Sequence, residues 1–489
     1  MIRDIRSARE RLFTPVDIAP LVFLRIVFGS VMLWEVVRYF QHGWIERYYS
    51  PADFHLRYYG FEWVTPWPGH GMQWHFVALG IAAACIAAGF LYRIAAAVFF
   101  AGFTYVFLLD EAHYLNHFYL VCLLSFLLIF VPAERSCSVD AWLGRVRRSD
   151  FAPAWALWVI RAQIGLPYLF GGIAKLNGDW IRGEPIRMWL AERSDYFLIG
   201  PYVHEEWFVY FFVIGGLLLD LLLVPSLLWR RTRVPAFLAA MSFHLMNAWL
   251  FRIGIFPWLM LAASLVFFPP EVSRRILNFL RFPIDGRASE GDVFTPPRKQ
   301  VLVAALLAVY LGIQVLMPLR HFLYPGNVNW TEEGHRFSWH MKLRDKEGNA
   351  VFHVVDRATG KKWTVNPSSH LDPWQASMVP KHPDMILQYA HELAEKSRRK
   401  GIADVEVHAD VLVSLNGRKR QRLIDPAADL AKVERSLHHA DWILPLTEPL
   451  PPPGRKRKIM DNQAHGPARD ARTGADTSGQ EISSAESSR

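Results

Sequence analysis

Long apolar runs follow one another as far as about residue 320, and short polar segments separate them. The hydrocarbon core of a bilayer is about 30 Å thick, so a helix that crosses it needs about 20 mostly apolar residues. Runs of this kind predict a mainly α-helical, polytopic membrane domain with about nine spans. The predicted spans are 19–40, 73–92, 94–110, 116–132, 154–175, 206–229, 234–251, 254–270 and 300–319.

The basic residues in the loops predict the side of the membrane on which each loop lies. With nine spans and the N-terminus inside, the inner segments carry eighteen arginines and lysines, and the outer loops carry six arginines. Cytoplasmic loops are enriched in Lys and Arg, so this bias favours an inside N-terminus. The odd number of spans then places everything after about residue 320 outside the cytoplasm.

After the last predicted span, apolar and polar residues alternate in short runs, which is typical of half-buried strands. We therefore expect a small extracytoplasmic domain of the β-rich or α+β class. The Asn416-Gly417 pair predicts a hairpin turn. The predicted strands are Val351–Val355, Lys362–Val365 and Val405–Val413, and the predicted helix is Asp384–Arg398.

The composition changes again at Pro449, where a proline run, a basic run and a Ser-, Ala-, Gly- and Asp-rich stretch follow. Such a segment cannot bury enough apolar surface to fold, so it predicts a disordered tail. The predicted division of the chain is 1–324 for the membrane domain, 325–448 for the outer domain and 449–489 for the tail.

Charge and motif content exclude several other classes of protein. The net charge of +9 would suit a nucleic-acid partner, but the basic residues sit in short clusters between apolar runs, so we expect none. Cys85, Cys122 and Cys137 offer neither a disulfide framework nor zinc-ligand spacing, and we expect no metal. The sequence contains no P-loop, no Rossmann glycine fingerprint, no His-Glu-x-x-His, no Gly-x-Ser-x-Gly and no transporter-like internal repeat.

The fifth predicted span carries polar residues along one stripe. Arg161, Tyr168 and Lys175 are seven residues apart, and a helix drifts only about 20° per seven residues. Ionisable groups inside a span are costly and are functional hypotheses by default. The structural alternative is that Lys175, at the end of its helix, extends its amine to the lipid headgroups.

Other polar residues fall at a similar depth. Asn116 and His117 begin the fourth span, and His244 and Asn247 share one face of the seventh. The structural alternatives are an interfacial histidine and a helix–helix hydrogen bond. Because the predicted topology puts all of these residues in the outer half of the membrane, we predict a polar cavity below the outer domain. It would suit an amphiphilic, lipid-soluble ligand from the bilayer and a polar partner from outside.

Six sequence blocks between about residues 18 and 440 have a familiar order. They are Val106–Asp110 with Asn116-His117, Gly172–Leu176 with Asp179-Trp180, Phe243–Asn247, Asn329–Thr331, Phe337–Trp339 and Arg422–Pro426. Together these blocks resemble the vitamin K-dependent γ-glutamyl carboxylase family. Its bacterial members share the transmembrane domain called HTTM, so the resemblance implies a multi-pass protein of a bacterial inner or plasma membrane.

The resemblance also implies an enzyme. Such an enzyme would oxygenate reduced vitamin K, a phylloquinone or menaquinone hydroquinone, to the epoxide and carboxylate protein glutamate, with O2 and CO2 as co-substrates. An uncharged Lys175 amine would deprotonate the hydroquinone, His117 would act on the glutamate carbanion or its protonation, and Asn116 would bind a quinone oxygen or an oxyanion. The implied quinone-binding residues are Tyr168, His244, Met246 and Asn247, and the implied glutamate-binding residues are Phe337, Trp339 and Met341.

The implied partners are a glutamate-containing protein or peptide and a quinone-epoxide reductase in the same membrane. The chain departs from the family at Gly334-His335, where the family has Leu-Tyr. It also lacks the cysteine pair that tethers the luminal domain of the animal enzymes to their membrane domain. Two alternatives therefore stay open: a quinone epoxidase without carboxylation, and a receptor or immunity-type membrane protein with no chemistry.

Overall fold

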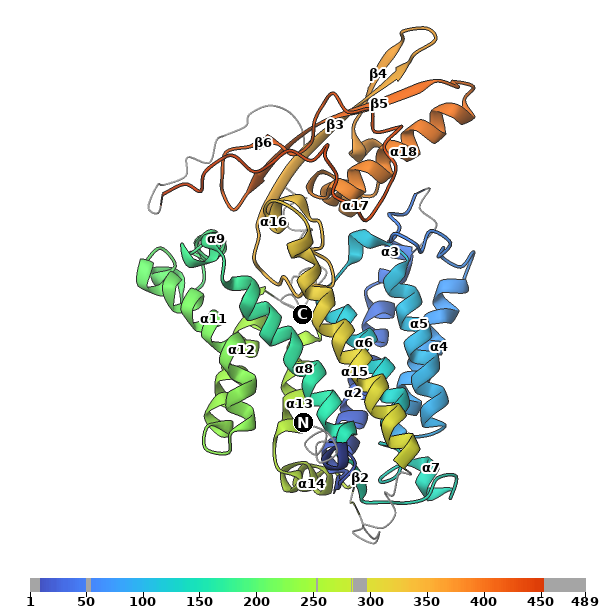
Figure 1. The fold of residues 1–489 in the computed structure, drawn as a ribbon, viewed down its shortest axis with the longest axis vertical. Helices are drawn as coiled ribbons and strands as arrows, with labels where there is room; N and C mark the ends of the chain where they lie inside the picture. The colour runs from blue at the N-terminus through green and yellow to red at the C-terminus, as the bar shows by residue number, and fades with distance from the viewer. Residues whose placement is uncertain (1–8, 50–53, 252–253, 283, 285–296, 453–489) are drawn as a thin grey trace, which may run out of the picture.

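A computed structural model describes residues 9–49, 54–251, 254–282, 284 and 297–452. Most of the predicted tail at 449–489 lies outside these residues. Figure 1 shows a long helical bundle with a smaller part that contains strands at one end. We call this smaller part the cap (residues 325–448).

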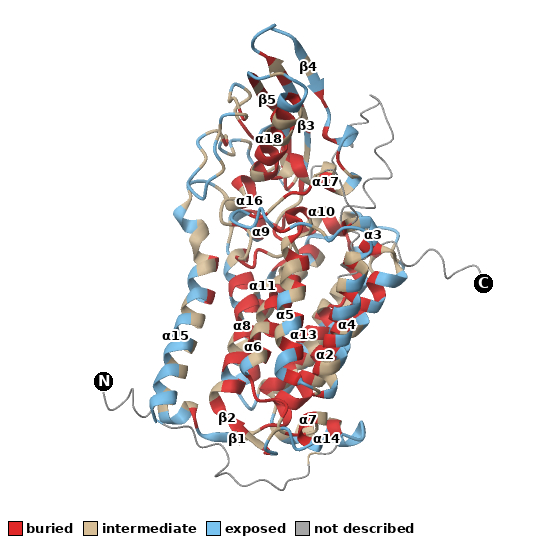
Figure 2. Cartoon of the chain, turned by 90° about the vertical axis from the view of Figure 1, so that its right-hand side faces the viewer, coloured by how far each residue is buried: buried red, intermediate tan, exposed pale blue. Residues whose placement is uncertain are grey.

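Helices form at each of the nine predicted places in the described chain. Successive helices run alternately toward and away from the cap (Figures 1 and 2). They are α2 (Ala19–Gln41), α4 (Gly71–Ala88), α5 (Tyr92–Leu108), α6 (Asn116–Phe130), α8 (Ala154–Lys175), α11 (Glu206–Leu228), α12 (Arg233–Phe251), α13 (Phe256–Ser264) with its extension η3 (Leu265–Phe267), and α15 (Pro297–Leu319).

Five of these helices are long and apolar enough to cross a membrane: α2, α4, α8, α11, and α15 together with η5 (Arg320–Leu323). The helices α5, α6 and α13 are apolar but shorter. Between α5 and α6 the chain forms the short 3-10 helix η1 (Glu111–His113) below the cap, where Ala112 O accepts a hydrogen bond from the Trp374 indole at 2.9 Å. The cap thus contacts this break between the two α-helices, and contact with protein allows backbone that is not α-helical.

The described parts of the loops that the arginine bias places inside lie at the end of the bundle far from the cap (Figure 1). There β1 (Pro15–Asp17) pairs antiparallel with β2 (Phe151–Pro153), and Arg274 bonds Asp17 at 2.8 Å. The amphipathic helix α14 (Pro270–Phe279) lies at the same end.

Exposed aromatic side chains occur at both ends of the bundle, as is typical of the two interfaces of a membrane. Those at the end near the cap include Trp63, Trp74 and Trp207, and those at the far end include Trp142, Trp229 and Phe279. Between these ends α15 is mostly exposed (Figure 2), with only 11% of its apolar window buried. So large an exposed apolar surface requires an apolar surrounding such as lipid.

The cap is an α+β domain built on one antiparallel sheet with the strand order β4-β3-β5-β6. Alternate residues of β5, from Val405 to Leu415, are buried, and α18 packs against this strand, so the alternation predicted from the sequence is confirmed. The elements are β3 (Lys346–Asp356), β4 (Lys362–Val365), α17 (Pro373–Met378), α18 (Pro383–Arg399), β5 (Val405–Leu415) and β6 (Gln421–Arg422).

Strand β3 begins five residues before the predicted Val351. Its first residues are polar, so their alternation was hidden in the sequence. Lys346 is nevertheless buried, because its amine donates to Trp330 O at 2.6 Å and to Glu332 Oε1 at 3.1 Å. The root of the strand is therefore held by polar contacts, which a hydrophobic pattern does not record.

The Asn416-Gly417 turn forms as predicted. Both residues have positive φ, 49° and 80°, and Arg418 N bonds Leu415 O at 3.1 Å. This geometry is that of a two-residue hairpin turn. The turn faces the membrane domain, because the Asn416 side chain donates to Asp179 Oδ2 at 2.9 Å.

Two glycines in α8 allow other parts of the chain to approach closely. A Cβ at Gly172 would lie 2.6 Å from Leu221 Cδ2 and 3.1 Å from Leu221 N of α11. A Cβ at Gly171 would lie 3.2 Å from both Asp220 Oδ2 and Met341 Cε. Small residues of this kind let helix backbones pack without an intervening side chain.

We expect Gly172→Ala to destabilise the bundle by about 1–3 kcal/mol, the usual cost of overpacking. Thermal unfolding in detergent, followed by circular dichroism, measures the effect as a lower Tm. The control is Gly215→Ala on α11, where nothing lies within 4 Å of the Cβ position. Equal Tm values for the two variants would contradict the close packing of α8 on α11.

Candidate functional site

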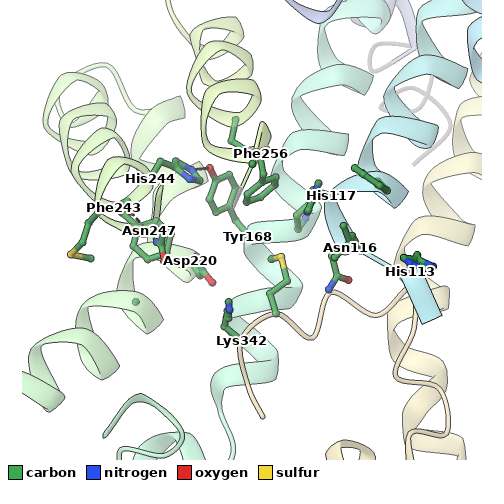
Figure 3. A pocket seen from close by; sticks show the side chains of 18 of the residues that line it. His113, Asn116, His117, Tyr168, Asp220, Phe243, His244, Asn247, Phe256 and Lys342 are labelled. Atoms are coloured by element: carbon green, nitrogen blue, oxygen red, sulfur yellow. Dashed lines mark hydrogen bonds between the residues drawn. The ribbon is translucent and has the colours of Figure 1, made fainter. Parts of the chain in front are cut away.

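A cavity of about 300 Å³ lies within the helical bundle at the end covered by the cap. Figure 3 shows residues on two sides of this cavity. Tyr168, Asp220 and His244 gather on one side, and Asn116 and His117 face them from the other. The cavity lining includes eight of the ten residues predicted from the sequence: Asn116, His117, Tyr168, Lys175, His244, Met246, Asn247 and Met341.

The strongest polar contact in the cavity joins Lys175 to Asp220 of α11. Lys175 Nζ lies 2.5 Å from Asp220 Oδ2, and the two side chains are only 6% and 5% exposed. The same amine lies 3.4 Å from Gly171 O and 5.1 Å from the Trp180 ring centroid. The amine is therefore turned into the protein, and the alternative of a lysine that reaches the headgroups is wrong.

Asp220 was missed by the sequence analysis. The signal was present, because Asp220 is the one ionisable carboxylate in the mostly apolar stretch 207–229. The contact with Lys175 depends on the close approach of α8 and α11 at Gly172. The Gly171-Gly172 pair in the sequence allows another helix or a ligand to approach closely, but it does not indicate which helix does so.

The second polar contact joins Tyr168 and His244. The tyrosine hydroxyl and His244 Nε2 share a hydrogen bond of 2.7 Å between α8 and α12. His244 thus makes the helix–helix hydrogen bond that was its structural alternative, and it also lines the cavity. Asn247 donates to Phe243 O of its own helix at 2.9 Å.

The opposite wall is organised by Tyr114, which precedes α6. Its hydroxyl donates to Asn116 Oδ1 at 3.0 Å and accepts from Phe337 N at 2.8 Å. The ring of His117 packs edge-on against Phe118 and tilted against Phe256, at centroid distances of 4.8 Å and 5.7 Å. Asn116 is therefore linked through one hydroxyl to the chain segment that descends from the cap.

That segment, Phe337–Lys342, covers the cavity. Phe337, Trp339 and Lys342 have φ between 53° and 62°, a conformation that costs free energy in residues other than glycine. Phe337 and Trp339 pack on Tyr119 at 4.9 Å and 5.1 Å, and neither lines the cavity. Of the three predicted glutamate-binding residues, only Met341 lines it.

The lining includes polar and aromatic residues that the sequence analysis did not select. Glu35 and Arg38 of α2 form an ion pair of 2.6 Å at one side of the cavity. His113 lies there half-buried against Tyr48, with 4.7 Å between ring centroids. Within the residues that the structure describes, no group of three His, Cys, Asp or Glu side chains is arranged to hold a metal ion.

The cap is held to the short helix that follows α8, the helix that carries Lys175. Asp179 lies in α9 (Gly178–Ile181), and its two carboxylate oxygens each accept a bond of 2.6 Å from the Arg418 guanidinium. Burial acts to raise the pKa of Asp179, but the bonds from Arg418 and Asn416 outweigh it and hold the pKa below its ordinary value. The turn after β5 therefore places the cap directly above the cavity.

A second contact holds the other side of the cap. Arg435 donates to Asp384 at 2.6 Å and lies 3.1 Å from Glu111, which follows α5. Glu111 also pairs with Arg336, next to Phe337. The cap is thus joined by ion pairs to both walls of the cavity.

Fold and cavity together define a class of protein: a multi-pass helical membrane protein with a mostly apolar cavity, which holds a few buried polar groups, below a separate α+β domain. Two family models match the chain. Residues 13–271 match the HTTM domain, and residues 299–449 match the lumenal domain of vitamin K-dependent gamma-carboxylase.

The chain belongs to the vitamin K-dependent gamma-carboxylase family, as the sequence blocks indicated. The second match begins at residue 299 and so includes α15 together with the lumenal-type cap. No solved structure matches the chain. The division at residues 324 and 325 stays a prediction.

Two arginines face the same Asp179 carboxylate and give a matched test of cap docking. We expect Arg418→Gln to destabilise the protein by about 3–5 kcal/mol, since it leaves a buried charge unpaired. Arg182, 58% exposed and 4.0 Å from Asp179, is the control, and Arg182→Gln should cost at most about 1 kcal/mol.

The ion pair of Asp179 with Arg418 predicts that the attachment of the cap depends on pH. A carboxyl whose folded-state pKa is depressed stabilises the fold above its unfolded pKa and loses that contribution as the pH falls through the folded value. Acid should therefore release the cap from the wild type, seen as faster proteolysis of residues 325–448. An Arg418→Gln protein with wild-type stability and acid response would contradict this docking.

Proposed function

We propose that this protein is an integral membrane enzyme that couples oxygenation of a reduced naphthoquinone to carboxylation of glutamate in a protein or peptide. About nine helices cross the plasma membrane of a bacterium in this proposal, and the cap lies outside the cytoplasm. The observation that carries the proposal is the buried Lys175–Asp220 pair, which faces Asn116 and His117 in one cavity below a lumenal-type carboxylase domain.

The cavity has the size and lining that a naphthoquinone ring requires. Small-molecule pockets have volumes of about 300–1,000 Å³ and are mostly apolar with a few placed polar groups. Here aromatic residues such as Trp180 and Phe256 supply flat apolar surface. The reduced quinone, when bound, supplies the electrons for oxygenation. The pair Tyr168 and His244 and the pair Lys175 and Asp220 offer polar contacts for its oxygens.

Carboxylation of the glutamate would depend on the wall of the cavity that holds Asn116 and His117. His117 is proposed to act on the carbanion at the γ-carbon of the glutamate or on its protonation. Asn116 is held by Tyr114 and is proposed to bind an oxygen of the quinone or an oxyanion. The glutamyl chain would approach along Phe337–Lys342, and Met341 is its proposed contact inside the cavity.

A second candidate is a quinone epoxidase without carboxylation. Two observations favour it: Gly334-His335 replaces the Leu-Tyr of the family, and Phe337 and Trp339 do not line the cavity. Both concern the binding of glutamate and leave the quinone side of the site unaffected. The two candidates therefore differ only in whether CO2 is fixed.

The test is an assay of membranes with reduced vitamin K, oxygen, labelled bicarbonate and a glutamyl peptide. Epoxide together with label in the peptide is expected for the first candidate, and epoxide alone selects the second. Lys175→Ala should lose both products by at least about 100-fold. Lys362→Ala, at an exposed lysine of the cap, is the control. If the folded protein makes neither product, both candidates fail.

A variant at His117 separates the two half-reactions. We expect His117→Ala to keep epoxide formation and to lose incorporation of the label by about 10²–10⁴-fold, as for removal of a general acid or base. The ratio of epoxide to label in one reaction mixture measures the uncoupling. If His117→Ala lowers epoxide formation and label incorporation by the same factor, His117 has no role specific to the glutamate.

A further inference from the structure

Tyr114 lies behind the wall of the cavity that holds Asn116 and His117, and it is not among the described residues that line the cavity. Its hydroxyl accepts a hydrogen bond from Phe337 N at 2.8 Å and donates one to Asn116 Oδ1 at 3.0 Å. Tyr114 thus joins the segment Phe337–Lys342, which covers the cavity, to a residue that faces the space for a ligand.

The groups that take part fix the direction of these two hydrogen bonds. A backbone N–H can only donate, so the Tyr114 oxygen accepts from Phe337. The phenol has a single proton, and Asn116 Oδ1 is the atom that receives it. If the Asn116 amide were turned over, its own N–H group would face the hydroxyl, and the phenol proton would lose this acceptor. The amide oxygen of Asn116 therefore faces Tyr114.

The amide nitrogen of Asn116 consequently faces the cavity. In Figure 3 the nitrogen lies on the side of Tyr168, and the amide oxygen lies on the side of His113. Among the residues that the structure describes, none is hydrogen-bonded to this nitrogen. An amide nitrogen has donors only, so it suits a ligand oxygen that accepts a hydrogen bond, such as a carbonyl oxygen or an ionised hydroxyl.

The Tyr114 hydroxyl keeps the proton that this arrangement requires. Burial raises the pKa of the phenol above its ordinary value, and the hydrogen bond from Phe337 N lowers the pKa by less. At neutral pH the phenol is therefore a donor to Asn116. A phenolate would have the opposite effect, because it could only accept a hydrogen bond and would attract the amide nitrogen.

The backbone amide at the start of this chain of hydrogen bonds belongs to a strained residue. Phe337 has a positive φ of 62°, which costs free energy in a residue other than glycine. Its ring packs edge-on against Tyr114 and Tyr119 at 5.4 Å and 4.9 Å, and Arg320 lies 5.7 Å from the ring centroid. These contacts offset the strain while the segment covers the cavity. Movement of the segment away from the cavity would also remove the bond to Tyr114.

We propose that Tyr114 is a positioning residue, which turns the amide nitrogen of Asn116 toward the ligand while the segment Phe337–Lys342 is closed. Phe337 N donates to the hydroxyl, the hydroxyl donates to Asn116 Oδ1, and Asn116 Nδ2 donates to an oxygen of the bound quinone. Without closure the hydroxyl can rotate, and the amide can turn over. This inference rests on the proposed function and makes the quinone side of the site depend on the segment that the glutamyl chain would approach.

Tyr114→Phe removes the hydroxyl and changes no side chain that lines the cavity. We expect it to lower kcat for epoxide formation by about 10–100-fold, because a misplaced binding group slows the reaction. KM for reduced vitamin K should change much less, because the amide binds an ionised oxygen more strongly than a neutral hydroxyl. The control is Tyr310→Phe, which removes a hydroxyl bonded to Gln163 at 2.7 Å outside the cavity lining. It should keep the wild-type kcat.

A double-mutant cycle separates positioning of Asn116 from general support of the fold. Asn116→Ala should lower kcat by about 10²–10³-fold, as for removal of a donor to an oxygen anion. If Tyr114 acts through Asn116, the addition of Tyr114→Phe to Asn116→Ala causes no further loss. Losses that multiply in the double variant would overturn the inference.

Asn116→Asp tests the direction of the amide without a change at Tyr114. Its carboxylate still accepts from the Tyr114 hydroxyl, but it has no N–H group for the ligand. We expect Asn116→Asp to be as slow as Asn116→Ala. If Tyr114→Phe does not fold, Asn116→Asp decides, since a rate near that of the wild type would overturn the inference.

A second readout needs no turnover. Hydrogen exchange followed by mass spectrometry reports how often the segment Phe337–Lys342 opens. Tyr114→Phe should speed exchange in peptides that contain Phe337, and Tyr310→Phe should leave it at the wild-type rate. Unchanged exchange in folded Tyr114→Phe protein would overturn the link to the segment. Wild type without epoxide would reject the proposed function itself, and hydrogen exchange would still test this link.

Discussion

The ion pair between Asp179 and Arg418 is the contact on which the geometry of the site depends. Asp179 lies four residues after Lys175, in the short helix α9 that follows α8, and Arg418 follows the hairpin turn of the cap sheet. Since both partners are buried, neither can leave the other without a large cost in free energy. The position of the cap is thus fixed relative to Lys175, and so is the segment Phe337–Lys342 that covers the cavity.

Charge burial also explains how the cap and membrane domain hold together without a cysteine bridge. Arg418 with Asp179 and Arg435 with Asp384 and Glu111 fasten two separate sides. A disulfide acts mainly by restricting the unfolded chain, whereas these pairs act in the folded state. The chain lacks the cysteine pair of the animal members of the family, but ion pairs attach its cap to the membrane domain, and the cap still lies over the cavity.

Much of the fold could be predicted from hydropathy and alternation, because helices and strands that bury one face leave a period in the sequence. The helices at the nine predicted places, the strand predicted at Val405–Val413 and the Asn416-Gly417 turn are of this kind. Interactions between distant segments leave no period. Asp220 meets Lys175 only through the contact of α8 with α11. Phe337 and Trp339 do not line the cavity, and the sequence pattern does not encode their positive φ angles.

Because Gly171 and Gly172 have no side chains, contact between the backbones of α8 and α11 sets the distance between Lys175 and Asp220. At Gly172 the side chain of Leu221 rests directly on the backbone of α8, with no layer of side chains between the two helices. Exchanges elsewhere in the apolar lining can change the shape and width of the cavity, while the two charged groups keep their separation. Such an arrangement leaves the lining free to change over evolutionary time, with the contact between Lys175 and Asp220 unchanged.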